Sequence, residues 1–166
     1  MEPLTVLIAD DHPIFRKGLR ALVAAMPDIE LVGEAASGEE AIGLAEQIQP
    51  DVILMDLQMP GGGGLTAIRK ILQTSPHIRV LVVTMFQDDE SVFEAMRAGA
   101  RGYVLKDAGD AEISRAILAV GSDEAKVGVR HACRGLGGEA GGFLLQFPGQ
   151  EAVVAIQTGH PLAAGG

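Results

Sequence analysis

Five short apolar runs alternate with five segments of helical spacing over the first 120 residues, and this alternation constrains the fold more than any other feature. The runs are short and bounded by turn residues, so they are expected to be buried strands, over 4–9, 30–35, 52–55, 78–83 and 101–105. Buried strands that alternate with helices indicate an α/β fold with a parallel sheet and helices on both faces. For five units the flavodoxin-like strand order 2-1-3-4-5 is expected, with the run at 30–35 at a sheet edge.

Start and stop signals delimit the helices. Pro13 opens the first helix, and Ser37 with Glu40 has the spacing of a capping box at the second. Asp88 or Asp89 is expected to cap the fourth helix, and Asp107 or Asp110 the fifth. The apolar faces predicted for the first, fourth and fifth helices are Ile14, Phe15, Leu19, Leu22, Val23 and Met26; Val92, Phe93, Ala95 and Met96; and Ile113, Ala116, Ile117 and Val120.

The third helix follows a run of four glycines, Gly61 to Gly64. Gly63 or Gly64 falls where that helix needs an N-cap, and glycine offers no side-chain acceptor there. An aspartate at position 63 is therefore expected to stabilise the chain, unless Gly63 requires a positive φ angle.

Four of the predicted strands end in polar functional groups. Asp10 and Asp11 follow the first strand, Asp56 the third, Thr84 the fourth and Lys106 the fifth. The carboxyl ends of parallel strands meet at one rim of the sheet, so these groups are expected to converge.

Three converging carboxylates repel one another, and a hard divalent cation relieves that repulsion. Mg²⁺ takes oxygen ligands, which Asp10, Asp11, Asp56 and the backbone carbonyl of Gln58 can supply. With Lys106 and Thr84 added, the rim has the composition of a site for an incoming phosphoryl group, with Asp56 as nucleophile. His12 is expected to be only a surface or capping side chain.

The chain also resembles a known family over residues 4 to 120. The stretches that carry the resemblance are 7–12 (LIADDH), 51–60 (DVILMDLQMP), 83–84 (VT) and 99–107 (GARGYVLKD). They look like a CheY-like response-regulator receiver domain, of the NarL/LuxR-type subclass of transcription regulators in two-component systems.

The resemblance implies a role for each matching residue. Asp56 would be phosphorylated by a partner histidine kinase, with Mg²⁺ held by Asp10, Asp11, Asp56 and the Gln58 carbonyl. Lys106 would bind the phosphoryl group, and Thr84 with Tyr103 would form the switch pair. The protein would be a signalling switch rather than an enzyme, and a homodimer could form through the fourth helix, fifth strand and fifth helix, or through the first and fifth helices.

Three other functions compete with the phosphorylated switch. A hydrolase that forms an aspartyl-phosphate commonly has Asp-x-Asp after its first strand, whereas Asp56 follows the third strand without a second aspartate. A nucleotide or flavin binder needs a phosphate loop where Asp10 and Asp11 stand. A receiver-like interaction module that no longer takes phosphate would have little need of an intact polar set.

Residues 121–166 have a different character, with 11 of the 22 glycines and no clear helical period. A loosely ordered tail is expected there, and the alternative is a hairpin of runs 143–147 and 152–156 around a turn at 148–150. No basic recognition helix is present and the net charge is −9, so no direct DNA binding is expected. A single cysteine, Cys133, and the lack of a signal peptide or membrane-length apolar run favour a cytoplasmic protein.

Overall fold

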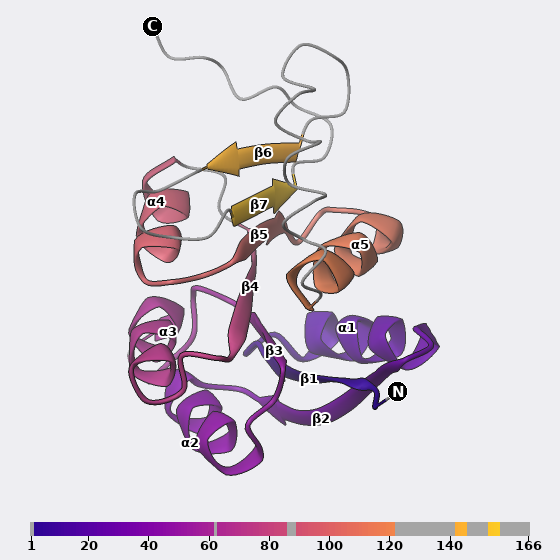
Figure 1. Cartoon of the computed structure of the whole chain (residues 1–166), viewed down its shortest axis with the longest axis horizontal. Coiled ribbons are helices and arrows are strands. Elements are labelled where there is room, and N and C mark those ends of the chain that lie inside the picture. The colour runs from indigo at the N-terminus through magenta and orange to yellow at the C-terminus, as the bar shows by residue number, and fades with distance from the viewer. Residues whose placement is uncertain (1, 62, 86–88, 122–141, 146–152, 157–166) are drawn as a thin grey trace, which may run out of the picture.

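The structure is a computed structural model that describes residues 2–61, 63–85, 89–121, 142–145 and 153–156 (Figure 1). The strands are β1 Leu4–Ala9, β2 Ile29–Ala35, β3 Val52–Met55, β4 Arg79–Thr84, β5 Gly102–Leu105, β6 Gly142–Leu145 and β7 Val153–Ile156. The helices are α1 Pro13–Ala25, α2 Gly38–Ile48, α3 Gly63–Thr74, α4 Asp89–Arg97 and α5 Asp110–Gly121.

The first five strands form a parallel sheet in the order β2-β1-β3-β4-β5, which confirms the flavodoxin-like order and the edge position of β2. In the register of β1 with β3, Ala9 lies opposite Met55. The residues that follow, Asp10 and Asp56, therefore leave the sheet side by side. The strand register alone brings the two carboxylates to one place.

Helices cover both faces of this sheet, with α1 and α5 on one side and α2, α3 and α4 on the other (Figure 1). Each strand supplies alternate residues to two separate cores, because successive side chains of a strand point to opposite faces. Leu7, Ile53 and Val80 belong to the core under α2 to α4. Ile8 and Leu54 belong to the core under α1 and α5, which explains why the strands read as unbroken apolar runs.

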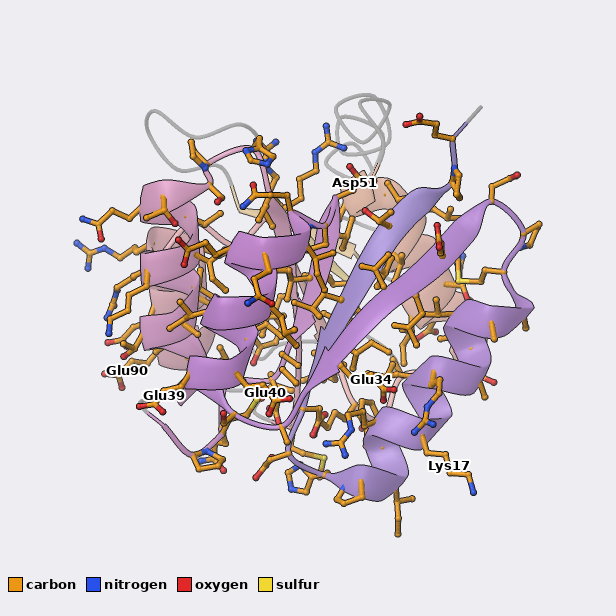
Figure 2. The ribbon with its side chains drawn as sticks, turned by 90° about the horizontal axis from the view of Figure 1, so that it is seen from below. Lys17, Glu34, Glu39, Glu40, Asp51 and Glu90 are labelled. Atoms are coloured by element: carbon orange, nitrogen blue, oxygen red, sulfur yellow. The ribbon has the colours of Figure 1, made fainter. Side chains whose placement is uncertain are left out.

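Charged side chains lie around this frame. Figure 2 shows Lys17 on α1 and Glu39 on α2 pointing outward from the helices. Glu34 of β2 lies near α1, with its carboxylate oxygens 3.5 Å from the Nε atoms of both Arg16 and Arg20. In the described part of the chain, no helix is long and apolar enough to cross a membrane.

The helix termini match the expected signals in part. The Ser37 hydroxyl accepts a hydrogen bond from the backbone N–H of Glu40 at 3.1 Å, so the predicted N-cap of α2 is confirmed. The Glu40 carboxylate accepts from the N–H of Ala36 rather than from that of Ser37.

Helices α4 and α5 both begin at an aspartate. The Gly109 carbonyl accepts the first bonds of α5, from the N–H groups of Glu112 and Ile113, so the expected Asp107 or Asp110 cap is wrong and Asp110 is the first helical residue. For α4 the expected cap is Asp88 or Asp89: Asp88 lies outside the described residues, and Asp89 is the first helical residue.

Two expectations about side chains are wrong, and an exception stated for Gly63 applies. Helical spacing predicts Ile14 on the buried face of α1 and Phe93 on that of α4, but Ile14 is 89% exposed and Phe93 is 47% exposed. Both lie at the edge of an otherwise correct apolar stripe, where helical spacing alone does not fix the boundary of the buried face. Gly63 has a φ angle of +77°, which is the exception that the expectation allowed, so an aspartate there would be strained instead of stabilising.

The sheet continues beyond β5 with two further strands, giving the order β2-β1-β3-β4-β5-β7-β6. β7 pairs in parallel with β5, and β6 pairs antiparallel with β7. The two apolar runs of the tail thus supply most of the residues of these two paired strands. The predicted turn at 148–150 and Cys133 lie outside the described residues.

Candidate functional site

The site is built at the carboxyl ends of β1 and β3. The backbone N–H of Asp56 donates to the carbonyl of Ala9 at 2.9 Å, and the N–H of Asp10 donates to the carbonyl of Ala35 at 2.9 Å. These bonds continue the sheet by one residue past each strand. They fix both aspartates while their side chains turn out of the sheet. Asp10 and Asp56 are 1% and 3% exposed.

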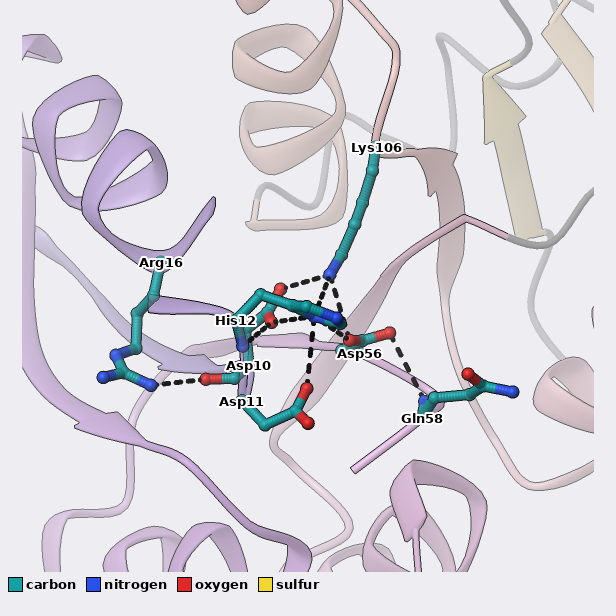
Figure 3. A network of polar contacts seen from close by, with 7 residues as sticks. All are labelled: Asp10, Asp11, His12, Arg16, Asp56, Gln58 and Lys106. Carbon is teal, nitrogen blue, oxygen red and sulfur yellow. Dashed lines mark hydrogen bonds and ion pairs between the residues drawn. The ribbon is translucent and has the colours of Figure 1, made fainter. Parts of the chain in front are cut away.

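Lys106 brings a buried positive charge to these carboxylates. Its Nζ atom lies 2.8 Å from Asp10 Oδ2 and donates a hydrogen bond to Asp56 Oδ2 at 3.0 Å (Figure 3). The ammonium also lies 4.6 Å from the centre of the Phe15 ring, which is cation–π distance. Lys106 follows β5 directly, so its position at the rim confirms the convergence of strand ends β1, β3 and β5.

His12 is exposed, as expected of a surface side chain, but its imidazole also contacts this cluster, which the sequence did not predict. It stands at the N-cap position of α1, but its side chain makes no capping hydrogen bond. Its Nδ1 atom lies 3.1 Å from Asp10 Oδ1, 3.2 Å from Asp11 Oδ1 and 3.5 Å from Asp56 Oδ2. The imidazole therefore lies over the three carboxylates, while more than half of the side chain remains exposed (Figure 3).

Arg16 and Phe15 are also site residues that the sequence did not single out. Arg16 donates a hydrogen bond from Nη1 to the backbone carbonyl of Asp10 at 2.7 Å. The available signal was position: both residues lie in the first turn of the helix that begins immediately after Asp10 and Asp11. Apolar periodicity assigned Phe15 to the core instead.

The local electrostatics act most strongly on Asp56. Burial raises the pKa of its carboxyl group above 3.8, and the nearby Asp10 charge raises it further. The Lys106 ammonium and the backbone N–H of Gln58, which lies 3.4 Å from Asp56 Oδ1, lower it without cancelling the effect of burial.

The donor set fits a hard divalent cation. Asp10, Asp11, His12 and Asp56 each present one possible ligand atom, and these atoms lie within 4.8 Å of one another. Asp11 Oδ1 is buried and accepts no hydrogen bond, although His12 Nδ1 lies 3.2 Å away. This oxygen is therefore available to coordinate a cation. The mouth of the site is lined by Asp11, His12, Leu57, Gln58 and Met59, so Gln58 lies at the same rim.

Thr84 and Tyr103 lie further back in the sheet. Thr84 is fully buried at the end of β4, and its backbone carbonyl accepts a hydrogen bond from the N–H of Lys106 at 2.8 Å. Tyr103 is in the middle of β5, opposite Val82 of β4, and is 4% exposed. Tyr103 therefore belongs to the strand that carries Lys106 to the rim, and Thr84 ends the neighbouring strand.

A parallel sheet of this order, with buried aspartates after β1 and β3 and a lysine after β5, defines a class of phosphoacceptor domains. The family model for the response regulator receiver domain matches residues 6–118, and the chain belongs to this family. Receiver domains are the signalling switches of two-component systems, and their general phosphoacceptor role extends to this chain.

Among relatives, the chain is 43% identical over 116 residues to the nitrate/nitrite response regulator protein NarL of Escherichia coli K12. It is 44% identical over 117 residues to the response regulator GacA of Pseudomonas aeruginosa. These matches cover 70% of this chain but 54% and 55% of the relatives, so the chain spans about half the length of the curated relatives it matches.

The chain is also similar to solved structures of response regulators. A LuxR-family response regulator from Aurantimonas is 40% identical, with a TM-score of 0.69, over 72% of this chain and 85% of that one. The signal receiver domain of a NarL homologue from Mycobacterium tuberculosis is 34% identical, with the same TM-score, over 71% of this chain and 95% of that one.

Proposed function

We propose that this chain accepts a phosphoryl group on Asp56 from a histidine kinase, in a reaction that depends on Mg²⁺. The observation that carries the proposal is the placement of the Asp56 carboxylate, buried at the end of β3 with the Lys106 ammonium 3.0 Å away. Burying the Asp56 carboxylate without a partner would cost free energy, and the Lys106 ammonium offsets that cost. The same ammonium can bind the oxygens of a phosphoryl group that arrives at Asp56.

The chemistry follows from these positions. An oxygen of Asp56 attacks the phosphorus, the new P–O bond forms, and the bond from phosphorus to the donor's imidazole nitrogen breaks, with the electron pair left on that nitrogen. Lys106 is placed to neutralise the phosphoryl oxygens, and Phe15 holds the lysine side chain in position. The open mouth lined by Gln58 and Met59 leaves room for a donor side chain.

Asp10, Asp11, Asp56 and the Gln58 carbonyl would hold the metal. Bound there, Mg²⁺ supplies charge neutralisation for the phosphoryl oxygens. Lys106 must then exchange its contact with Asp10 for one with the phosphoryl group. His12 Nδ1, 3.1 to 3.5 Å from the same three carboxylates, offers a further ligand atom beside them.

Thr84 and Tyr103 are proposed as the switch pair. The backbone bond from Lys106 to the Thr84 carbonyl ties the ends of β4 and β5 together beside Asp56. A phosphoryl group that draws the Thr84 hydroxyl inward would leave space for Tyr103, and so shift the two-state equilibrium of that strand pair.

The test is labelling by a small phosphodonor such as acetyl phosphate, followed by intact-mass measurement. We expect one phosphoryl group on the chain in Mg²⁺, none in excess chelator, and none on Asp56→Asn. The matched control Asp107→Asn removes an exposed carboxylate near the same rim and should label normally. Equal labelling of Asp56→Asn, or labelling that ignores the chelator, contradicts the proposal.

A homodimer is proposed through α1 and α5, one of the two expected surfaces. Ile14, exposed on α1, lies beside a groove that Phe15, Leu22 and Ile113 line between these helices. The other expected surface, made by α4, β5 and α5, has β7 paired along β5. Sedimentation of the wild type and of Ile14→Glu tests this, and we expect the substitution to weaken the dimer. If the dimer is equally stable in both proteins, α1 is not part of the interface.

A further inference from the structure

The strand that leads to the site, β5, is not at the edge of the sheet. β7 pairs with it in parallel, with Gly102 opposite Val154, Tyr103 opposite Ala155 and Val104 opposite Ile156. Figure 1 shows β7 between β5 and β6, on the far side of β5 from β4. The tail strand thus takes the place where a five-stranded sheet would end.

Without β7, β5 would be an exposed edge of the kind that proteins usually protect. Its four residues, Gly102–Leu105, carry no charge and no proline, and all are buried. An unpaired apolar edge offers its free N–H and C=O groups to any extended segment. β7 pairs with the backbone groups of this edge, and β6, a strand of four residues, becomes the new edge of the sheet.

The geometry favours strand addition within one molecule. The segment 122–141 joins the end of α5 to β6, and β7 also lies in contact with α5. Because α5 follows β5 directly, the tail strands stay near this edge at a high effective concentration.

β5 also connects β7 to the phosphoacceptor site. Tyr103, opposite Ala155, is three residues from Lys106, and Lys106 is held by Asp10 and Asp56 at 2.8 and 3.0 Å. A phosphoryl group that draws Lys106 away from Asp10 pulls on the end of β5. Strand pairing with β7 holds β5 in its present register against that movement.

We propose that the edge of β5 is a strand-accepting surface that β7 occupies in cis, and that this occupancy opposes phosphoryl binding at Asp56 and Lys106. The inference rests on the proposed phosphoacceptor function. Coupling of this kind is reciprocal: β7 weakens binding of the phosphoryl group, and the bound group loosens β7.

The test uses the full chain and the variant Val154→Pro, which removes an N–H and fixes φ in the middle of β7. Ala163→Pro is the matched control, because it places proline in the same tail outside both strands. Val154→Gly is a milder variant should the proline variant fail to fold. Two measurements are made: amide exchange at residues 102–105 without ligand, and the affinity for beryllofluoride in Mg²⁺.

Beryllofluoride binding can be followed through Tyr103, because the chain has one tyrosine and no tryptophan. We expect faster exchange of the β5 amides in Val154→Pro than in Ala163→Pro and the wild type. We expect a gain in beryllofluoride affinity of at least about fivefold in the same variant. In the wild type, beryllofluoride should speed exchange at residues 153–156.

The outcomes separate the parts of the inference. Equal β5 exchange in Val154→Pro and the wild type overturns the strand cover, and faster exchange with unchanged affinity overturns the coupling. Exchange protection that disappears on dilution shows that the strand comes from a second copy, and overturns the cis arrangement. Failure of the wild type and both variants to bind beryllofluoride overturns the proposed function and the coupling together, while exchange without ligand still decides the strand cover.

Discussion

At the scale of single residues, Asp56 combines two demands that conflict. As the proposed nucleophile it must be ionised, yet it is 3% exposed, and burial raises its pKa. A carboxyl group with a folded-state pKa above its unfolded value is equally protonated in both states below the unfolded pKa. As pH rises through the folded pKa, the native state must hold a charge that water would hold better, and stability is lost.

Asp56→Asn should therefore raise the free energy of unfolding at pH 7, by about 1 kcal/mol on the usual scale for a desolvated polar group. The gain should fade as the pH falls through the raised pKa toward 3.8. Urea melts between pH 4 and 8 measure it. The control Asp107→Asn removes an exposed carboxylate and should show no such pH dependence; a variant no more stable at pH 7 than at pH 4, relative to wild type, contradicts the argument.

Lys106 poses the converse problem, because two buried carboxylates depend on it. Lys106→Met keeps the length of the side chain and removes the ammonium, which leaves Asp10 and Asp56 without their cation. Removing one partner of a buried ion pair costs about 3–5 kcal/mol, and millimolar Mg²⁺ should restore part of it. Lys17→Met, exposed on α1 (Figure 2), should change stability by less than about 0.5 kcal/mol.

The comparison of the two lysine variants shows whether the Lys106 ammonium stabilises the buried carboxylates. If Lys106→Met unfolds at the same urea concentration as Lys17→Met, the ammonium does not hold the carboxylates in solution. If its loss of stability is the same with and without Mg²⁺, the metal does not use those carboxylates.

At the scale of elements, the sequence predicted the strands well because each is a continuous apolar run. It predicted the limits of the buried helix faces poorly. β1, β3 and β5 could be predicted almost to the residue because each is an apolar run that ends in a charged group. Ile14 and Phe93 could not, since a helical stripe has no sharp edge in the sequence. His12 was missed because its contacts depend on how the β1–α1 turn folds back over Asp56.

The glycine loop before α3 shows the same limit. That Gly61 and Gly63 both have φ angles near +78° is a backbone property that the sequence suggests only as an option. Gly64 is held by the chain itself: its N–H donates to the Leu57 carbonyl at 2.9 Å, and a Cβ there would overlap the backbone carbonyl of Asp56.

Gly64→Ala should therefore destabilise the chain and displace the peptide that carries Asp56. The added Cβ would also lie 2.7 Å from the Leu57 Cα, so no side-chain rotation relieves the overlap. Gly43→Ala in α2 is the matched control, since nothing lies within 4 Å of its Cβ position, and it should gain about 0.5–1 kcal/mol. Urea melts and phosphodonor labelling of both variants check this; labelling of Gly64→Ala at the wild-type rate would show that the loop tolerates the change.

At the scale of the whole molecule, the order of β1 to β5 was predictable because parallel strands joined by helices have few allowed arrangements. The extension by β7 and β6 was not. Its partner strand, β5, lies about fifty residues earlier, and a glycine-rich sequence without periodicity carries no signal for so distant a pairing. Apolar runs suggested strands but not where they would add to the sheet.

The two cores lie on opposite faces of the same sheet, so neither can be lost alone. Ile53 and Leu54 are neighbours in β3, yet they belong to different cores. The site at the end of β3 should therefore report on the whole fold: Mg²⁺ with beryllofluoride should raise the unfolding midpoint in a single transition.

At a ligand concentration one hundred times its Kd, the gain in the free energy of unfolding is about 2.7 kcal/mol. Asp11→Asn should lose most of this gain by weakening metal binding, and Asp56→Asn should lose the part due to beryllofluoride, whereas Asp107→Asn should keep all of it. Calorimetry would contradict this view of the molecule if the ligand split the transition in two, because the site would then stabilise one face of the sheet and not the other.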